Sequence, residues 1–213
     1  MKLVVFGASG TIGSRIVAEA LNRGHQITAV SQDPDSFDRA DARINVVRGN
    51  VLDPASVAQV VRGADAVVSS IGVRRGKYPQ SLMAEGARAL IAGLRQAGVR
   101  RLVVVSSAGS LEVAPGQMLM DTPGFNPQTR PGSLSHLEAL KALREASDLE
   151  WTAISPPQTI RPGERTGNFR VGAERLLTDA EGKSAISTED YAVALVDELE
   201  QPRHVRQRFT VAY

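Results

Sequence analysis

The chain has 213 residues, of which 42% are hydrophobic, so it is long enough to bury one well-filled core. Its 25 basic and 23 acidic side chains leave a net charge of +2, which is too small to indicate nucleic acid as a partner. The absence of cysteine excludes disulfides, thiolate metal sites and thiol catalysis, and we expect no metal site of another kind.

The first residues already have the pattern of a core strand, which leaves no room for a signal peptide. No apolar run approaches the roughly 18 residues that a membrane span requires. We therefore expect a cytoplasmic protein without a membrane partner. We also expect a single domain, because no stretch has the composition of a linker between two folding units.

The first thirteen residues combine a hydrophobic strand, a glycine-rich turn and the start of a helix. Residues 2–6 form the strand, and Gly7, Gly10 and Gly13 follow at the spacing G-x-x-G-x-x-G. Glycine lets such a turn reverse tightly and lets a pyrophosphate approach the backbone. From Thr11 on, apolar residues recur at helical spacing, so free N–H groups at a helix N-terminus would face an anion. The motif predicts a phosphate-binding turn, and the alternative is an ordinary glycine-rich turn.

Beyond this turn, short apolar strands alternate with helical patterns along the chain. We expect strands at residues 27–30, 44–48, 66–68, 101–105, 151–154 and 208–212. After the first helix, which ends at Gly24, we expect helices that open at Asp53, run from 79 to 97 and from 133 to 146, and open again at Thr188. The loops are expected at residues 31–42, with at most one helical turn, and at 73–77, 111–131 and 155–168.

Six or more short buried strands alternating with helices predict an α/β fold with a doubly wound, mainly parallel sheet and helices on both faces. In such sheets, ligands bind at the carboxyl ends of the strands, near the point where the strand order reverses. The segments at these ends are polar or glycine-rich, namely residues 7–13, 31–33, 50–51, 71–75, 106–110 and 155–160. We expect residues 1–213 to form one domain with a dinucleotide-sized site. Loops 106–132 and 155–170 are expected on the substrate side of that site.

The chain resembles the atypical short-chain dehydrogenases of the NAD(P)-binding Rossmann superfamily, in particular the NADH-flavin reductases, the biliverdin reductase B type and NmrA-like proteins. The likeness runs through residues 7–13, 49–53, 83–88, 106–108, 155–157 and 186–192. It implies an NAD(P) cofactor. The residues it places at that cofactor are Gly7, Ser9, Gly10, Thr11, Ile12, Gly13, Ser31, Gln32, Asn50, Val51, Ile71, Gly72, Arg74, Ser106 and Pro156.

Two of these positions carry alternatives. Asn50 stands where the family usually has an aspartate that accepts a hydrogen bond from the adenine amino group, and its side-chain carbonyl can do the same. Alternatively, Asn50 is only a turn asparagine before a helix. Arg74 matches an arginine that lies beside the cofactor in relatives, which favours a phosphate contact over a merely solvated side chain.

The choice between NAD and NADP depends on the end of the second strand. NAD-specific members have an acidic residue there, which binds the ribose 2′-hydroxyl and repels a 2′-phosphate. Ser31 and Gln32 hold this place, so the main barrier to NADP is absent, although the arginine that relatives often carry at Gln32 is missing as well. The residues that could supply the charge instead are Arg15, Arg39 and Arg43. We expect NADP in preference to NAD.

Ordinary short-chain dehydrogenases use a Tyr-x-x-x-Lys pair in which the lysine lowers the pKa of the tyrosine. This chain has Lys141, but Leu137 stands four residues earlier. Tyr78 and Tyr191 lie in other segments and cannot replace the tyrosine at this spacing. A carbonyl reductase of the ordinary kind is therefore disfavoured.

Flavin reduction does not need that tyrosine, because the hydride passes between two organic molecules that the protein mainly has to orient. By resemblance to the biliverdin reductase B type, Ser107 and His136 are the candidate catalytic residues. Ser107 could instead bond a backbone group at the strand end, and His136 could be an exposed helical residue without a task. Two further family histidines correspond to Leu140 and Gln158, which makes biliverdin itself a doubtful substrate.

Two functions from different classes follow. The first is an NAD(P)H-dependent reductase of a flavin, a quinone or another flat conjugated small molecule, with the flavin as acceptor rather than bound group and loop 111–131 as part of a lid. The second is a non-catalytic, NmrA-like dinucleotide sensor. A sugar-nucleotide epimerase is disfavoured by the missing tyrosine and the short C-terminal region. The sequence leaves open whether the protein is a monomer or a dimer.

Overall fold

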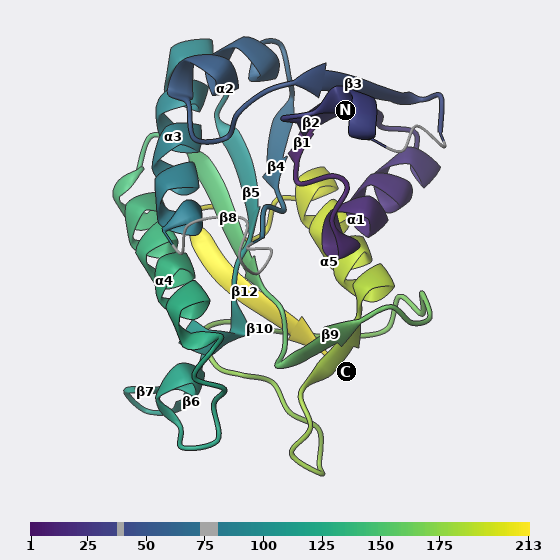
Figure 1. The fold of residues 1–213 in the computed structure, drawn as a ribbon. Coiled ribbons are helices and arrows are strands. Elements are labelled where there is room, and N and C mark those ends of the chain that lie inside the picture. Colours follow the sequence, from purple (N-terminus) through teal and green to yellow (C-terminus); the bar gives the residue numbers. More distant parts are fainter. Residues whose placement is uncertain (38–40, 73–80) are drawn as a thin grey trace.

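The centre of the molecule is an eight-stranded sheet (Figure 1), and the computed structural model describes residues 1–37, 41–72 and 81–213. Its strands lie in the order β10-β12-β8-β5-β4-β1-β2-β3. Their bounds are β1 Lys2–Phe6, β2 Gln26–Ser31, β3 Ile44–Arg48, β4 Ala66–Ser69, β5 Arg101–Val105, β8 Glu150–Ser155, β10 Arg170–Gly172 and β12 Gln207–Ala212. Neighbours are parallel except β10, which is antiparallel to β12. The order reverses between β1 and β4, as a doubly wound sheet requires.

Helices cover both faces of the sheet, because each parallel strand returns through a crossover. The helices are α1 Thr11–Asn22, α2 Pro54–Val61, α3 Leu82–Ala97, α4 Arg130–Glu145 and α5 Thr188–Glu200. Figure 1 shows α1 and α5 on one face and α2, α3 and α4 on the other, and each layer encloses its own apolar core. The predicted fold class is therefore confirmed. Among the described residues, no helix combines the length and apolar character needed to cross a bilayer.

Helix ends follow local signals in the sequence. The Asp53 side chain accepts a hydrogen bond from the N–H of Ala55 at 3.0 Å and caps α2, and Gly98, with φ of +72°, ends α3 in the left-handed conformation. For α5 the cap is Ser187 rather than the predicted Thr188, since the Ser187 hydroxyl accepts from the N–H of Asp190 at 2.9 Å. Both residues carry a hydroxyl, so only the extended backbone of Ser187 decides between them.

The two long predicted loops contain regular structure. Residues 111–131 include the hairpin strands β6 Glu112–Ala114 and β7 Gln117–Met118, and α4 begins three residues earlier than expected. Pro131 lies in the first turn of α4, where its missing N–H costs no hydrogen bond. Residues 155–168 include β9 Thr159–Arg161, which pairs in parallel with β11 Ala185–Ser187. Strands of two or three residues are too short to show a period of two in the sequence.

A buried ion-pair network closes the amino edge of the sheet, opposite the carboxyl ends where ligands bind. Arg101, the first residue of β5, donates to the Glu198 carboxylate at 3.0 Å and to the Thr152 hydroxyl at 2.8 Å. His204 Nδ1 lies 2.8 Å from the same carboxylate. Although burial raises the pKa of Glu198, the hydrogen bonds from His204 and the charge of Arg101 lower it below its ordinary value overall.

Candidate functional site

The glycine-rich turn lies at the point where the strand order reverses, between the carboxyl ends of β1 and β4. Gly7 has φ of +80°, and a Cβ there would lie 2.4 Å from the carbonyl oxygen of Ser70 at the end of β4. A Cβ at Gly13 would lie 2.0 Å from the carbonyl oxygen of Gly7. Gly7 therefore lets the turn approach β4, and Gly13 lets α1 pack against the turn.

The N-terminus of α1 is open to a ligand. Its cap residue, Gly10, has no side chain to accept from the first-turn N–H groups, and no acidic residue lies in that turn. Ser9 and Thr11 are exposed on either side of it. The first N–H groups of a helix have no partner within the helix, so the groups of Thr11, Ile12 and Gly13 form a cradle for an anion. These residues fit a pyrophosphate.

The predicted adenosine side lies at the ends of β2 and β3. Ser31 forms a turn, in which its hydroxyl accepts from the N–H of Asp33 at 3.1 Å. The carbonyl oxygen of the Asn50 side chain accepts from the N–H of Leu52 at 3.0 Å and from Gln32 Nε2 at 3.4 Å. Asn50 is thus a turn asparagine in this structure, and an adenine amino group would have to replace Gln32 on that oxygen. Its role towards adenine stays a prediction.

Helix α3 comes close to these strand ends because of a residue that the sequence analysis did not single out. A Cβ at Gly86 would lie 2.9 Å from Cδ1 of Ile71 and 3.8 Å from Cγ2 of Val51. Gly86 therefore brings two of the predicted cofactor residues against one helix. Gly72, which follows Ile71 in the chain, is exposed to solvent. Arg74 lies outside the described residues.

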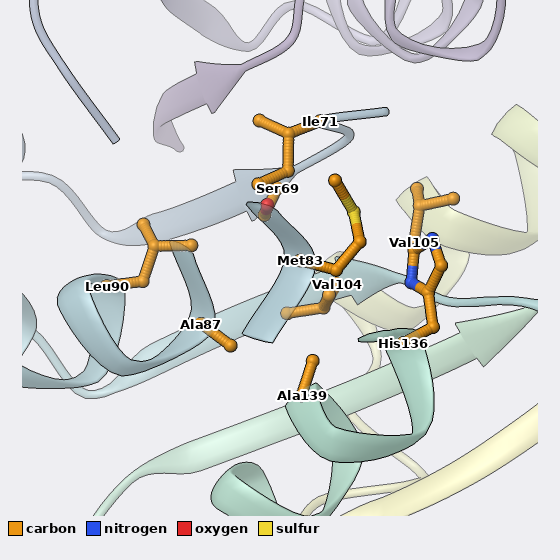
Figure 2. A pocket seen from close by; sticks show the side chains of 9 residues that line it. All are labelled: Ser69, Ile71, Met83, Ala87, Leu90, Val104, Val105, His136 and Ala139. Carbon is orange, nitrogen blue, oxygen red and sulfur yellow. The ribbon is translucent and has the colours of Figure 1, made fainter. Parts of the chain in front are cut away.

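An apolar pocket lies beside this edge, between the ends of β4 and β5 and the helices α3 and α4 (Figure 2). Its volume is about 10 Å³, room for one water molecule at most. The side chains that line it are Ser69, Ile71, Met83, Ala87, Leu90, Val104, Val105, His136 and Ala139. In Figure 2 the His136 imidazole, from α4, lies toward Val105, from β5. The sequence left open that His136 is an exposed helical residue without a catalytic task. The structure places this side chain at the pocket.

The apolar walls determine the charge of His136. Burial lowers its pKa from the ordinary 6.5 to about 4, although part of the residue remains exposed to solvent. The imidazole is therefore neutral at pH 7. It can donate or accept a hydrogen bond there, but it cannot act as a charged acid.

We expect His136 to titrate near pH 4, whereas an unperturbed histidine titrates near 6.5. Because the folded pKa lies below the unfolded one, the protein should lose stability as the pH falls from about 6.5 to about 4. The chain has three histidines, so NMR titration of the wild type beside His136→Asn assigns the signal directly. A His136 signal that titrates above pH 6 would contradict the burial of its ring.

Ser107 has two polar neighbours at the end of β5. Its hydroxyl oxygen accepts from the N–H of Gly109 at 3.1 Å and lies 3.3 Å from the Ser133 hydroxyl of α4. The first contact is the backbone role that the sequence left open. Ser133 was missed by the sequence analysis. A Cβ at Gly109 would lie 2.3 Å from Ser133 Oγ, so the glycine lets α4 approach the end of β5 this closely. Ser106 is buried beside this pair, whereas Ser107 is partly exposed.

The lysine of the ordinary dehydrogenase pair does not reach this site. The Lys141 side chain is 57% exposed, and its ammonium group lies 2.7 Å from the Glu138 carboxylate on the outer side of α4. Leu137 stands one turn earlier and is partly buried. The polar groups that α4 turns toward the strand ends are Ser133 and His136.

The family is decided by the match of a family model described as NAD(P)H-binding, which covers residues 7–202. The chain belongs to this NAD(P)H-binding family. The resemblance to atypical, NmrA-like short-chain dehydrogenases is thereby confirmed, and the family is oxidoreductase-like in character.

Three solved structures of similar proteins cover the whole of this NAD(P)H-binding chain. A provisionally named exported protein from Burkholderia pseudomallei is 48% identical, with a TM-score of 0.92 and 100% of that chain covered. A provisionally named epimerase from Bacteroides thetaiotaomicron is 38% identical, with a TM-score of 0.90 and 96% covered. A provisionally named NADH-flavin reductase from Streptococcus pneumoniae is 32% identical, with a TM-score of 0.87 and 99% covered. Their names agree on no single activity.

In this NAD(P)H-binding domain, a fully buried carboxylate holds the loop that follows β8. Asp190, near the start of α5, accepts hydrogen bonds from the N–H groups of Thr166 and Gly167 at 2.8 and 2.7 Å and from the Tyr213 hydroxyl at 2.8 Å. The loop begins with Pro156, which is buried at the end of β8. The family-like motif at residues 186–192 therefore anchors the predicted substrate-side loop 155–170 through Asp190.

Proposed function

We propose that the protein is a cytoplasmic NAD(P)H-dependent reductase that prefers NADP and acts on a flat conjugated small molecule, such as a free flavin or a quinone. The observation that carries this proposal is the apolar pocket with a neutral imidazole, adjacent to the open N-terminus of α1 at the same edge of the sheet. When bound, a reduced nicotinamide supplies the hydride. The similarity to the provisionally named NADH-flavin reductase supports the choice of acceptor.

The residues of the chain then have the task of orienting two ring systems and excluding water. The pocket has room only for a water-sized group, so an acceptor ring would lie against its apolar mouth rather than inside it. Ser107, held by Ser133, would offer a hydroxyl at the end of β5, and the neutral His136 would offer a ring nitrogen. The β6–β7 hairpin in residues 111–131 would cover the substrate side.

The proposal is tested by steady-state oxidation of NADPH and of NADH with FMN, FAD and a panel of quinones. We expect turnover with at least one of these acceptors and a lower KM for NADPH. Dinucleotide binding without turnover by any acceptor would contradict the reductase and favour the NmrA-like sensor, because both use the same cradle.

Replacing Ser107 by alanine should lower turnover about fivefold to tenfold, the worth of one hydrogen bond, and change dinucleotide affinity by less than about threefold. Lys141→Ala is the matched control on the outer side of α4, and it should alter neither quantity. An equal loss of turnover and affinity in Ser107→Ala would show that the hydroxyl only supports the turn at Gly109.

A further inference from the structure

We propose that Arg48 binds the 2′-phosphate of NADP(H) and is the residue that selects this dinucleotide over NAD(H). The inference rests on the proposed function and names a specificity residue for it. Ser31 and Gln32, at the end of β2, carry no charge that could bind a 2′-phosphate. A positive charge near this strand end has to come from another element.

The strand register brings Arg48 to this place. Ser31 and Arg48 are paired at the parallel ends of β2 and β3, and the N–H of Gly49 donates to the carbonyl oxygen of Ser31 at 2.9 Å. Ile44 and Val46 pack against the core beneath α1, so Arg48, two residues further, continues the same face. Arg48 therefore lies at the carboxyl edge, on the side of the sheet where α1 offers its N-terminus.

The Arg48 guanidinium already lies at Gln32. Its Nη1 donates to the carbonyl oxygen of Gln32 at 2.8 Å, and the residue is exposed. No carboxylate within residues 1–37, 41–72 and 81–213 forms an ion pair with it. A guanidinium has five N–H donors, so several remain for a phosphate while one holds the group in place.

The other arginines considered from the sequence are engaged or distant. Arg15 donates to the Glu189 carboxylate at 3.1 Å. Arg43 pairs with Asp41 at 2.6 Å and precedes the opposite end of β3, about 17 Å along the strand from Arg48 at some 3.3 Å per residue. Arg39 lies outside the described residues.

The test compares Arg48→Gln with Arg43→Gln and Arg15→Gln as matched controls. Fluorescence titration gives the Kd of NADPH and NADH for each protein, and adenosine 2′,5′-bisphosphate against 5′-AMP isolates the 2′-phosphate. We expect Arg48→Gln to weaken NADPH and the bisphosphate by roughly tenfold to a hundredfold, the worth of a charge-assisted hydrogen bond, and to leave NADH within about twofold. Both controls should keep the wild-type ratio.

An unchanged NADPH-to-NADH ratio in Arg48→Gln would overturn the inference while leaving the proposed function intact. A wild-type preference for NADH would overturn the inference together with the NADP preference of the proposed function, and it would point to ribose recognition by an acid such as Asp33. A wild-type protein that binds neither dinucleotide would instead refute the proposed function. Thermal unfolding of each variant confirms that it is folded before its affinities are compared.

Discussion

Replacing Gly10 by aspartate is expected to weaken dinucleotide binding at least a hundredfold without destabilising the protein. Gly10 has the extended backbone of a helix cap, with φ of −74° and ψ of 166°, so an Asp carboxylate there can accept from the N–H of Ile12 or Gly13. That contact adds about 0.5 kcal/mol to the stability of α1. It also fills the anion cradle with a negative charge, which costs a bound phosphate roughly 4 kcal/mol at about 4 Å.

Gly10→Asn is the matched neutral control, because it caps the helix in the same way and a Cβ at this position meets the same carbonyl oxygen of Gly7 at 3.2 Å. We expect it to weaken binding far less than Gly10→Asp. Gly13→Ala should behave differently from both, since its Cβ would lie 2.0 Å from Gly7 O and disrupt the turn itself. Kd values for NADPH and unfolding midpoints separate the cases, and undiminished binding by Gly10→Asp would remove the pyrophosphate from this turn.

Glu198→Gln is expected to lower the free energy of unfolding by about 3–5 kcal/mol, because it leaves the Arg101 guanidinium buried without its counter-charge. Arg101 and Glu198 side chains are only 7% and 3% exposed, so water cannot replace the lost partner. Urea unfolding measures the change. Because the network lies at the amino edge of the sheet, NADPH affinity of the folded variant should stay within about twofold of the wild type.

The matched control is Glu138→Gln, which removes an exposed pair with Lys141 and should cost less than about 1 kcal/mol. Acid supplies a second readout. The folded pKa of Glu198 is lowered, so its stabilisation is present above the unfolded pKa of about 4.5 and is lost as the pH falls through the folded value. Glu198→Gln should lack this part of the acid dependence. A cost no larger than that of Glu138→Gln would show that the buried charges are not coupled.

Local patterns predicted most of the framework. The strands at residues 44–48 and 101–105 match β3 and β5 at both ends, because apolar β-branched runs between turn residues have few other solutions. Asp53 and Gly98 likewise function as the helix signals that the sequence indicated. The short strands β9, β10 and β11 were missed, since they form only where distant segments supply a partner.

The candidate site was likewise predicted only in part from the sequence. Glycine spacing alone indicates a phosphate cradle, because the conformation it needs is a property of the backbone within seven residues. Ser133 beside Ser107, Gly86 against Ile71, and Asp190 beneath the loop after β8 could not be predicted, since each contact joins segments separated by 15 residues or more.

By itself, the sequence determined the doubly wound parallel sheet, the family and the turn at Gly7, because these depend on periodicity and on short-range backbone geometry. Only the tertiary structure decided that His136 is neutral, that Lys141 points to solvent and that Arg48 reaches Gln32. A pKa, an exposed side chain and a cross-strand hydrogen bond all depend on neighbours that the fold brings together, and spacing along the chain carries no information about them.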